Sequence, residues 1–369
     1  MDSSANVKYA AIVLAGGLST RMHQFKPLLP LGDTTVTDRV TGTFLNVGVA
    51  VFLVAGYRHD DIAAGIKNRA VTIVYNPDFE KGMFSSIQAG LRRLGPKYRA
   101  FFVNPVDIPL VRPATIKRLM DTAEENPDSI IYPVFLGRRG HPPLIPAKMI
   151  PAILGWEKGG GLKAVLESFK KIALEVSVPD SFILFDIDTP ENYQVLLERF
   201  RRYEVPTDEE CRALLEVYQM APEKARHSYK VADVAVAIGR ALDAAGHNVD
   251  VETVRIAAIL HDISKGCRKH DAEGGRLLRE LGFGKVGDIV AVHSDLAGGD
   301  LSLPLESKSV FLADKFVGGE KLVSLEERYH HPDFPPEVQA QITERLKVAR
   351  GVKRELEKLI GRPLESVIS

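Results

Sequence analysis

The sequence predicts two domains, an α/β domain with a doubly wound, mostly parallel sheet followed by an all-α domain. Its 369 residues exceed a typical single core, because domains usually hold roughly 100–200 residues. From Tyr9 to about Asp186, short apolar runs alternate with amphipathic stretches, the pattern of a parallel sheet covered by helices. Beyond residue 204 strand signals nearly vanish. We therefore expect domains at 1–203 and 204–369.

Apolar runs predict the central strands of the first domain at Tyr9–Leu14, Val49–Val54, Val71–Tyr75 and Ala100–Val103. Helical spacing predicts helices at Thr34–Leu45, Asp60–Asn68, Phe84–Leu94 and from about Glu191 to Tyr203. A proline and the capping-type Thr207 then mark the boundary. The second domain should hold helices at Asp208–Met220, Arg226–Ala245, Val251–His261, Asp271–Leu281, Lys285–His293 and Pro336–Ile360.

The charge balance limits the classes of partner. Lys+Arg 48 against Asp+Glu 48 leaves no global field toward nucleic acid or an anionic membrane. The polar start Met1–Lys8 lacks a secretory pattern, and no apolar stretch nears the roughly 18 residues of a membrane span. Cys211 and Cys267 are too few for a disulfide framework. These features predict a cytoplasmic protein without nucleic-acid or membrane partners.

A glycine-rich loop follows the first predicted strand at Leu14, Ala15, Gly16 and Gly17. Small residues there allow a tight turn and let a polyphosphate approach the backbone amides. Arg21 and Lys26, just behind the loop, supply positive charge for phosphates. A glycine pair alone more often only turns the chain, so the prediction depends on its position after a strand and on these basic residues.

Leu14-Ala-Gly-Gly-Leu-Ser-Thr-Arg-Met22, followed by Lys26-Pro-Leu-Leu-Pro-Leu31, resembles the signature of nucleotidyltransferases that attach CMP or GMP to molybdopterin. These enzymes are a branch of the nucleotide-diphospho-sugar transferase-like fold. The residue after Met22 is usually glycine in this family, whereas this chain has His23. The resemblance covers about residues 9–200 and continues in order through Asn76-Pro77, Gly82–Leu91, Asp107-Ile108-Pro109, Arg139-Gly140-His141-Pro142, Gly159–Leu162 and Asp186–Pro190.

The resemblance implies that Asp107 and Asp188 hold one Mg²⁺, while Arg21 and Lys26 neutralise the β- and γ-phosphates. The acceptor phosphate is already an anion, so the reaction needs no general base and instead needs repulsion between anions to be offset. The alternative interpretations are that Asp107 caps a turn and that Asp188 caps a helix. The substrate-binding candidates on the nucleotide side are Leu14, Ala15, Gly16, Gly17 and Ser85. Ser85 and Ser86 alternatively cap the backbone rather than take part in catalysis.

Two segments bear on the substrates. Leu14-Ala-Gly-Gly resembles the guanylyl branch, whereas Gly82–Ile87 and Arg139–Pro142 resemble the cytidylyl branch, which favours CTP over GTP. Arg139 and His141 are implied to face a molybdopterin-type acceptor, or else only shape a loop. The family also implies a molybdenum hydroxylase apoenzyme or its maturation factor as a partner. A sugar phosphate or phosphocholine remains an alternative acceptor, because related folds share the triphosphate grip.

Six potential metal ligands occur within about ninety residues of the second domain, beside apolar residues that would anchor them in a core. Adjacent residues on a helix diverge by about 100°, close to the angle between neighbouring ligands of an octahedral ion. His261 and Asp262 can therefore serve one metal, or Asp262 can bridge two. Imidazoles mixed with carboxylates suit Mn²⁺, Fe²⁺ or Mg²⁺. The six are His227, His261, Asp262, His270, His293 and Asp314.

His227-Ser-Tyr-Lys-Val-Ala, Ile259–Lys265, Ile289–His293 and Phe311–Lys315 resemble the motifs of the HD phosphohydrolase superfamily, in its order. The resemblance implies His227, His261, Asp262 and Asp314 as the minimum ligand set. His270 and His293 match positions used by members with two metals, so the site holds either one metal or two. Asp262 is then a catalytic residue, because the metal lowers the pKa of an attacking water. Lys265 either contacts the substrate phosphate or is a solvated lysine at a helix end.

The second domain also has a regulatory interpretation. The domain alternatively senses a nucleotide and regulates the first, binding a ligand through its metal without turnover. His247, His330 and His331 have no comparable context, so we interpret them as surface residues.

Overall fold

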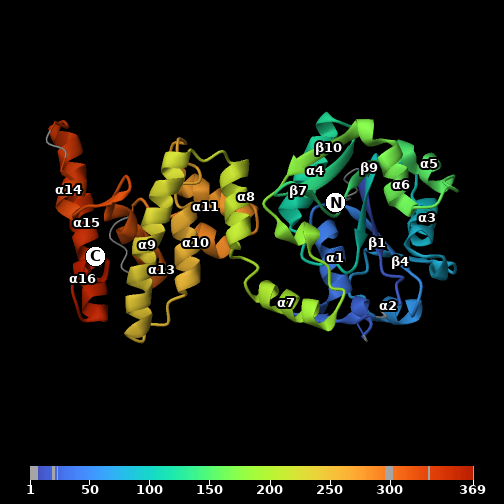
Figure 1. Ribbon diagram of the computed structural model, residues 1–369, viewed down its shortest axis with the longest axis horizontal. Coiled ribbons are helices and arrows are strands. Elements are labelled where there is room, and N and C mark those ends of the chain that lie inside the picture. Colours follow the sequence, from blue (N-terminus) through green and yellow to red (C-terminus); the bar gives the residue numbers. More distant parts are fainter. Residues whose placement is uncertain (1–6, 19–20, 23, 296–301, 331–332, 369) are drawn as a thin grey trace, which may run out of the picture. The chain divides into compact units, whose positions relative to one another are not determined.

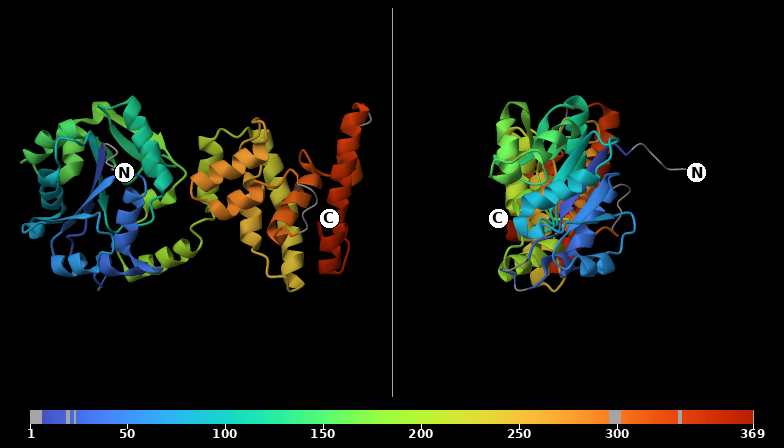
Figure 2. Two further views of the ribbon diagram at one scale, coloured as in Figure 1. Left: turned by 180° about the vertical axis from the view of Figure 1, so that it is seen from behind. Right: turned by 90° about the vertical axis from the view of Figure 1, so that its right-hand side faces the viewer.

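The computed structural model describes residues 7–18, 21–22, 24–295, 302–330 and 333–368. They fall into two compact units, Met1–Arg202 and Tyr203–Ser369 (Figure 1). Figure 2 shows the sheet of the first unit and the helices of the second from two further directions. In the part of the chain so described, no helix is long and apolar enough to cross a membrane.

The first unit is built on a mixed sheet with the strand order β10-β7-β9-β6-β1-β4-β5, and β8 pairs with β7. β1 runs parallel to both β4 and β6, whereas β9 runs antiparallel to its neighbours β6 and β7. The predicted doubly wound, mostly parallel sheet is therefore confirmed. The strands are β1 Tyr9–Leu14, β4 Ala50–Ala55, β5 Thr72–Tyr75, β6 Ala100–Pro105, β7 Ile130–Phe135, β8 Arg138–Arg139, β9 Leu144–Pro146 and β10 Ala173–Ser177.

Helices cover this sheet, and one of them starts later than its apolar spacing predicts. Thr35 pairs with Pro30 in a small hairpin and then caps the helix, because its side chain accepts from Asp38 N at 3.1 Å. The hairpin strands are β2 Pro30–Leu31 and β3 Thr34–Thr35. The helices are α1 Val36–Leu45, α2 His59–Gly65, α3 Met83–Arg93, α4 Pro113–Glu125, α5 Ile150–Leu154, α6 Gly161–Ser168 and α7 Pro190–Arg201, with 3-10 turns at Lys26–Leu28, Phe79–Lys81, Ala147–Met149, Lys170–Ile172 and Ser181–Leu184.

The register of β1 and β6 sets where the functional loops lie. Leu14 is the partner of Pro105, so the two strands end together, and Val106 N donates to Leu14 O at 3.0 Å. Ile12 in β1 and Phe101 in β6 are fully buried, which holds both strands in the core. The loop after Leu14 and the segment after Pro105 therefore lie side by side at one edge of the sheet.

The second unit is helical, as predicted, apart from one two-stranded hairpin. Its core lies mainly between α9, α10 and α13, and the sequence analysis did not assign α13. The predicted helix at Lys285–His293 ends at Val290, so His293 follows the helix. The elements are α8 Asp208–Val217, α9 Pro222–Ala244, α10 Val251–Leu260, α11 His270–Glu280, α12 Gly284–Val290, α13 Leu305–Lys315, β11 Val317–Gly318, β12 Lys321–Leu322, α14 Leu325–Arg328, α15 Pro336–Ile360 and α16 Glu365–Ile368.

Candidate active sites

The glycine-rich loop after β1 lines a pocket of about 370 Å³. Ala15 N donates to Val54 O at 2.9 Å, so the chain leaves the sheet directly after this residue. A Cβ on Gly16 would stand 3.3 Å from both Gly56 N and Ser86 Oγ, a close approach that favours glycine. Ser19, Thr20 and His23 lie outside the described residues. The predicted residues that line this pocket are Leu14, Ala15, Gly16, Gly17, Lys26 and Asp107.

Lys26 joins the two predicted carboxylates of this site. Its Nζ donates to Asp188 Oδ1 at 2.7 Å and to Asp107 Oδ2 at 3.4 Å. Ile187 N donates to Asp107 O at 3.0 Å, which ties the segments carrying the two carboxylates together. Arg21 Nη1 lies 3.2 Å from Asp188 Oδ2, but the Arg21 side chain is 77% exposed against 12% for Lys26. The lysine is therefore the buried, fixed cation of the site.

The two carboxylates differ in their electrostatics. Burial raises the pKa of Asp107, and the nearby charge of Asp186 acts in the same direction, while Lys26 opposes both. For Asp188 the hydrogen bond from Lys26 lowers the pKa. Two carboxylates share the buried ammonium of Lys26, which itself lines the pocket, and together they offer hard oxygen ligands. This donor set fits a divalent cation such as Mg²⁺.

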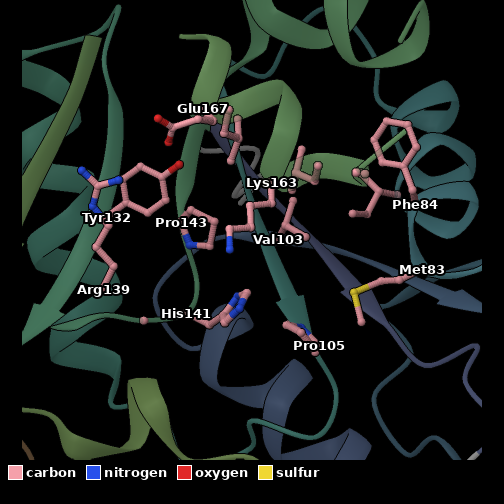
Figure 3. Close-up of a pocket in the computed structure, with 16 residues that line it drawn as sticks. Met83, Phe84, Val103, Pro105, Tyr132, Arg139, His141, Pro143, Lys163 and Glu167 are labelled. Carbon is pink, nitrogen blue, oxygen red and sulfur yellow. The ribbon is translucent and has the colours of Figure 1, made fainter. Parts of the chain in front are cut away.

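A second pocket, of about 630 Å³, adjoins the first, because Met83 and Pro105 line both (Figure 3). Arg139 and His141 line it, as does Lys163 from α6, whose side chain points into the pocket near His141. Arg139 Nε donates to Glu175 Oε1 at 2.6 Å. Burial lowers the pKa of His141, so its imidazole is neutral at pH 7.

The turn between Arg139 and His141 requires glycine. A Cβ on Gly140 would lie 2.4 Å from Ile183 O, and His141 N donates to that same carbonyl at 2.8 Å. The backbone around Ile183 therefore fixes how His141 enters the pocket.

The two serines at the start of α3 have different roles, since one holds the start of the helix and the other lines a pocket. Ser85 Oγ donates to Gly82 O at 2.8 Å and accepts from Asn76 Nδ2 at 2.9 Å, which holds the start of the helix. Asn76 Nδ2 also donates to Ser86 Oγ at 3.0 Å. Ser86, not Ser85, lines the pocket beside the glycine-rich loop. The predicted candidate Ser85 therefore holds the start of the helix, and its neighbour Ser86 is the residue in the pocket wall.

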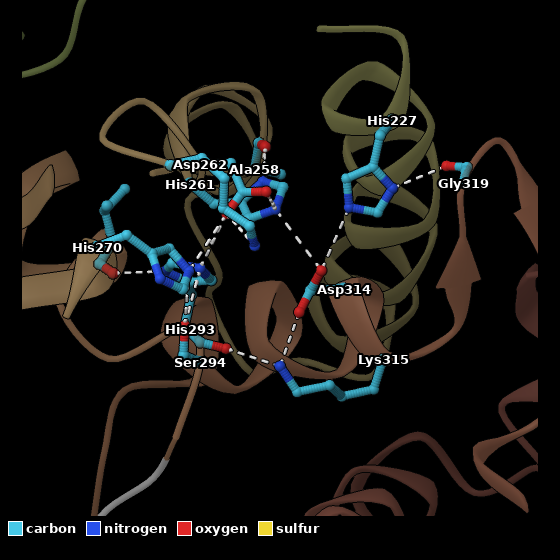
Figure 4. A network of polar contacts seen from close by, with 12 residues as sticks. His227, Ala258, His261, Asp262, His270, His293, Ser294, Asp314, Lys315 and Gly319 are labelled. Atoms are coloured by element: carbon cyan, nitrogen blue, oxygen red, sulfur yellow. Dashed lines mark hydrogen bonds and ion pairs between the residues drawn. The ribbon is translucent and has the colours of Figure 1, made fainter. Parts of the chain in front are cut away.

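In the second unit, all six candidate ligands lie together (Figure 4). His227 Nε2, from α9, lies 3.4 Å from Asp314 Oδ1 on α13, and His261 Nε2 lies 3.6 Å from the same oxygen. On the other side, Asp262 Oδ1 lies 3.4 Å from His270 Nε2 and 3.6 Å from His293 Nε2. The ends of four helices and the second turn of α9 thus supply one cluster.

Backbone contacts fix the orientation of three of the histidines. Three of them contact a backbone carbonyl through Nδ1 at 2.7 Å, and because a carbonyl only accepts, Nδ1 carries a proton, which leaves Nε2 as the ring nitrogen that a cation can use. His261 Nε2 is buried without a hydrogen-bond partner, which suits a metal ligand. The three pairs are His227 with Gly319, His261 with Ala258 and His293 with Val290.

Asp262 belongs to two groups of ligand atoms, and within each group the atoms lie within 4.8 Å of one another. One group contains His227 and His261, and the other contains His270 and His293. A carboxylate shared by two such groups has the arrangement of a bridging ligand between two cations. The donor set, imidazole nitrogen with carboxylate oxygen, fits Mn²⁺ or Fe²⁺.

The protonation states also suit a cation. Burial alone would raise the pKa values of Asp262 and Asp314, but neighbouring histidine and lysine side chains bring both well below the usual value. Burial lowers the pKa values of His270 and His293, so both rings are neutral at pH 7. The hydrogen bond with Asp314 raises the pKa of His227.

Several residues of this cluster escaped the sequence analysis. Lys315 Nζ donates to Asp314 Oδ2 at 2.7 Å and to His293 O at 3.2 Å, and its place beside Asp314 was the available signal. Arg328 Nη2, from α14, lies 3.9 Å from Asp314 Oδ1, and no motif pointed to it. Lys265, by contrast, was a predicted candidate, and its Nζ lies 3.1 Å from Asp262 Oδ1.

Of the described residues, His247 and His330 are the other histidines of the second unit, and neither belongs to the two groups of candidate ligands. His247 Nε2 contacts Leu359 O at 3.3 Å, His330 is exposed, and His331 lies outside the described residues.

Comparison with protein families gives a match for each unit. Residues 11–174 match the MobA-like NTP transferase domain, and residues 225–318 match the HD domain.

Three known proteins illustrate what the chain is similar to. The molybdenum cofactor cytidylyltransferase of Escherichia coli K12 is 26% identical over 190 residues, which cover 51% of this chain and 95% of that protein. The uncharacterized protein MJ0778 of Methanocaldococcus jannaschii is 34% identical over 119 residues, covering 27% of this chain and 70% of that protein. The crystal structure of Rv0371c from Mycobacterium tuberculosis is similar with a TM-score of 0.47 and 26% identity, over 52% of this chain and 98% of that chain.

Proposed function

We propose that this chain, which belongs to the MobA-like NTP transferase family through its first unit and to the HD family through its second, transfers CMP, in preference to GMP, to a molybdopterin-type acceptor. The observation that carries the proposal is the pair of adjoining pockets that share Met83 and Pro105. Lys26 and Asp107 line the first pocket, while Arg139 and His141 line the second. A nucleotide in one pocket and an acceptor in the other would meet at the shared wall.

The reaction follows from this placement. A phosphate oxygen of the acceptor bonds to the α-phosphorus, the bond from that phosphorus to the bridging oxygen breaks, and pyrophosphate leaves with the electron pair. Lys26 and Arg21 offset the negative charge of the departing pyrophosphate. Asp107 and Asp188 would hold the Mg²⁺, which supplies charge neutralisation between α-phosphate and acceptor. The neutral His141 can donate or accept a hydrogen bond to the acceptor without adding charge.

Pyrophosphate release tests the transferase. The full chain is incubated with Mg²⁺, molybdopterin and each of CTP, GTP, ATP and UTP. We expect more pyrophosphate release with CTP than with GTP, and loss of this release in Asp107→Asn. The control variant is Asp121→Asn, which changes an exposed aspartate on α4 and should leave the release unchanged. The absence of pyrophosphate with every nucleotide would refute the transferase. Release with phosphocholine or a sugar phosphate but not with molybdopterin would replace the acceptor.

For the second unit we propose a metal-dependent phosphohydrolase with two metals bridged by Asp262. The support is the sharing of Asp262 between two ligand groups. The metal supplies an activated water, while the carboxylates remain ionised and the imidazoles of His270 and His293 neutral to hold it.

Metal content tests this arrangement. Asp262→Asn should lose both metals, whereas His270→Gln should lose no more than one, as measured by elemental analysis of the purified protein. Equal losses in the two variants would contradict the bridge. Altered transferase kinetics in Asp262→Asn without hydrolysis of any phosphate compound by the parent would support regulation instead.

A further inference from the structure

Three cationic side chains contact the two carboxylates of the metal-binding cluster, and they differ in exposure. Lys315 pairs with Asp314 and is 9% exposed. Lys265 pairs with Asp262 and is 44% exposed, while Arg328 approaches Asp314 and is 36% exposed. A side chain that binds a substrate arriving from solvent must be partly exposed, as Lys265 and Arg328 are.

Lys315 is committed to the protein. Its ammonium donates both to Asp314 Oδ2 and to His293 O, so it serves to hold a ligand and a neighbouring turn. Lys265 and Arg328 are the two outer members of one chain of contacts that runs through the cluster. Lys265 meets Asp262, His261 Nε2 lies 3.6 Å from both Asp262 Oδ2 and Asp314 Oδ1, and Arg328 meets Asp314.

The position of Arg328 is built into the fold. Ser324 and Glu327 form a capping box that starts α14, and Arg350 of α15 pairs with Glu326 at 2.8 Å. Leu325, at the start of α14, is buried in the core. Arg328 therefore projects from an anchored turn. It also lies beyond residues 225–318, the segment that matches the HD domain.

We propose that Arg328 and Lys265 bind phosphoryl groups at the two ends of this chain of contacts, and that the substrate of the second unit is a phosphoric anhydride rather than a phosphate monoester. The inference rests on the proposed phosphohydrolase. Once cations hold the oxygens of Asp262 and Asp314, the charges of Lys265 and Arg328 are available to an anion. The planar guanidinium of Arg328 matches the oxygens of a phosphoryl group. One cation at each end suits a substrate that carries charge on two linked phosphorus atoms.

The chemistry balances with water as the only co-reactant. The water oxygen forms a bond to one phosphorus, and the bond from that phosphorus to the bridging oxygen breaks. The departing phosphate keeps the electron pair of that bond, and a proton of the water passes to the departing phosphate or to solvent. Arg328 or Lys265 then offsets the charge on whichever phosphate departs.

Hydrolysis by the full chain, with Mn²⁺, of inorganic pyrophosphate and of p-nitrophenyl phosphate tests the proposal. For Arg328→Gln we expect the KM for pyrophosphate to rise about tenfold, a change that corresponds to the loss of roughly 1.4 kcal/mol for one charged contact. The KM for p-nitrophenyl phosphate should rise less than twofold. Arg328→Lys should recover part of the loss. Arg276→Gln is the control, because Arg276 pairs with Glu273 and Glu280 on its own helix. Equal effects of Arg328→Gln on both substrates would overturn the proposal and leave the hydrolase standing.

Binding provides a readout without turnover. Titration calorimetry with methylenediphosphonate should show about tenfold weaker binding to Arg328→Gln than to the parent, with inorganic phosphate changed less than twofold. Comparing variants cancels any binding to the first unit. Weaker binding without hydrolysis by the parent would support the anhydride site and contradict the hydrolase. Unchanged binding of the diphosphonate would overturn the inference whatever the hydrolysis result.

Discussion

Replacing Gly275 by alanine should separate two helices of the second unit and weaken metal binding at the proposed site. A Cβ at Gly275 in α11 would lie 2.6 Å from both Gly287 O and Ala291 Cβ. Neither atom belongs to a flexible side chain end, so the helices must move apart. His270 begins α11 and His293 follows α12, so this movement would draw His270 and His293 out of line with Asp262.

The expected cost follows from two opposing effects. Overpacking of this severity costs about 3 kcal/mol, at the upper end of its usual range. Alanine in place of glycine inside a helix returns roughly 1 kcal/mol. The net loss of about 2 kcal/mol should lower the melting temperature of a unit of this size by roughly 4–8 °C.

Gly351→Ala is the matched control. Gly351 also lies inside a helix, α15, but no heavy atom would lie within 4 Å of its new Cβ, so this variant should be neutral or slightly stabilising. Calorimetry gives the melting temperatures, and elemental analysis gives the metal content. The single tryptophan, Trp156, lies in the first unit, so its fluorescence does not report on the second. Equal melting temperatures of Gly275→Ala and Gly351→Ala, with equal metal content, would refute the reasoning.

Three further predictions concern charge, thiols and a helix cap. Burial raises the pKa of Asp107, and the charge of Lys26 opposes this rise, so Mg²⁺ binding without nucleotide should increase as the pH rises and Asp107 ionises. Lys26→Met should shift this increase to higher pH. A titration of Mg²⁺ binding that is not shifted in Lys26→Met would contradict the prediction. Cys267 is exposed, whereas burial raises the pKa of Cys211, so a thiol reagent should label Cys267 in the native protein and Cys211 only after unfolding; similar rates would contradict the burial. Thr207→Ala removes the capping box of α8 and should lower the free energy of unfolding by about 1 kcal/mol in urea, and a loss no larger than for an exposed Thr→Ala change would show that the cap contributes nothing.

The fold followed from the sequence where a pattern is local. The apolar run Tyr9–Leu14 predicted β1 to the residue, since a buried strand must be apolar throughout. The antiparallel β9, Leu144–Pro146, went unassigned because three residues show no periodicity. α13, Leu305–Lys315, was missed for the opposite reason: its buried Ser307, Lys308 and Ser309 interrupt the apolar stripe.

The cluster of the second unit shows a similar division. The sequence could identify the six candidate ligands, because histidines and aspartates next to apolar runs are costly to bury without a partner. Their pairing was not, since Asp262 meets His270 and His293 only after α11 and α12 pack together. The glycines that permit this packing, Gly275 and Gly287, carry no chemical signal of their own.

Residues that select a substrate should be harder to find than those that perform the chemistry. A metal or a phosphate requires particular atoms in nearly fixed order, so Asp262 and the loop at Gly16 stand within motifs. Arg328 need only bring a cation to the carboxylate of Asp314, and Lys163 need only bring one to the wall of a pocket, so any nearby helix can supply such a residue. Arg328 comes from α14, outside the segment matched to the HD domain. If Arg328→Gln changes the preference between pyrophosphate and p-nitrophenyl phosphate while metal content is unchanged, the cluster supplies the reaction and a neighbouring helix supplies the choice of substrate.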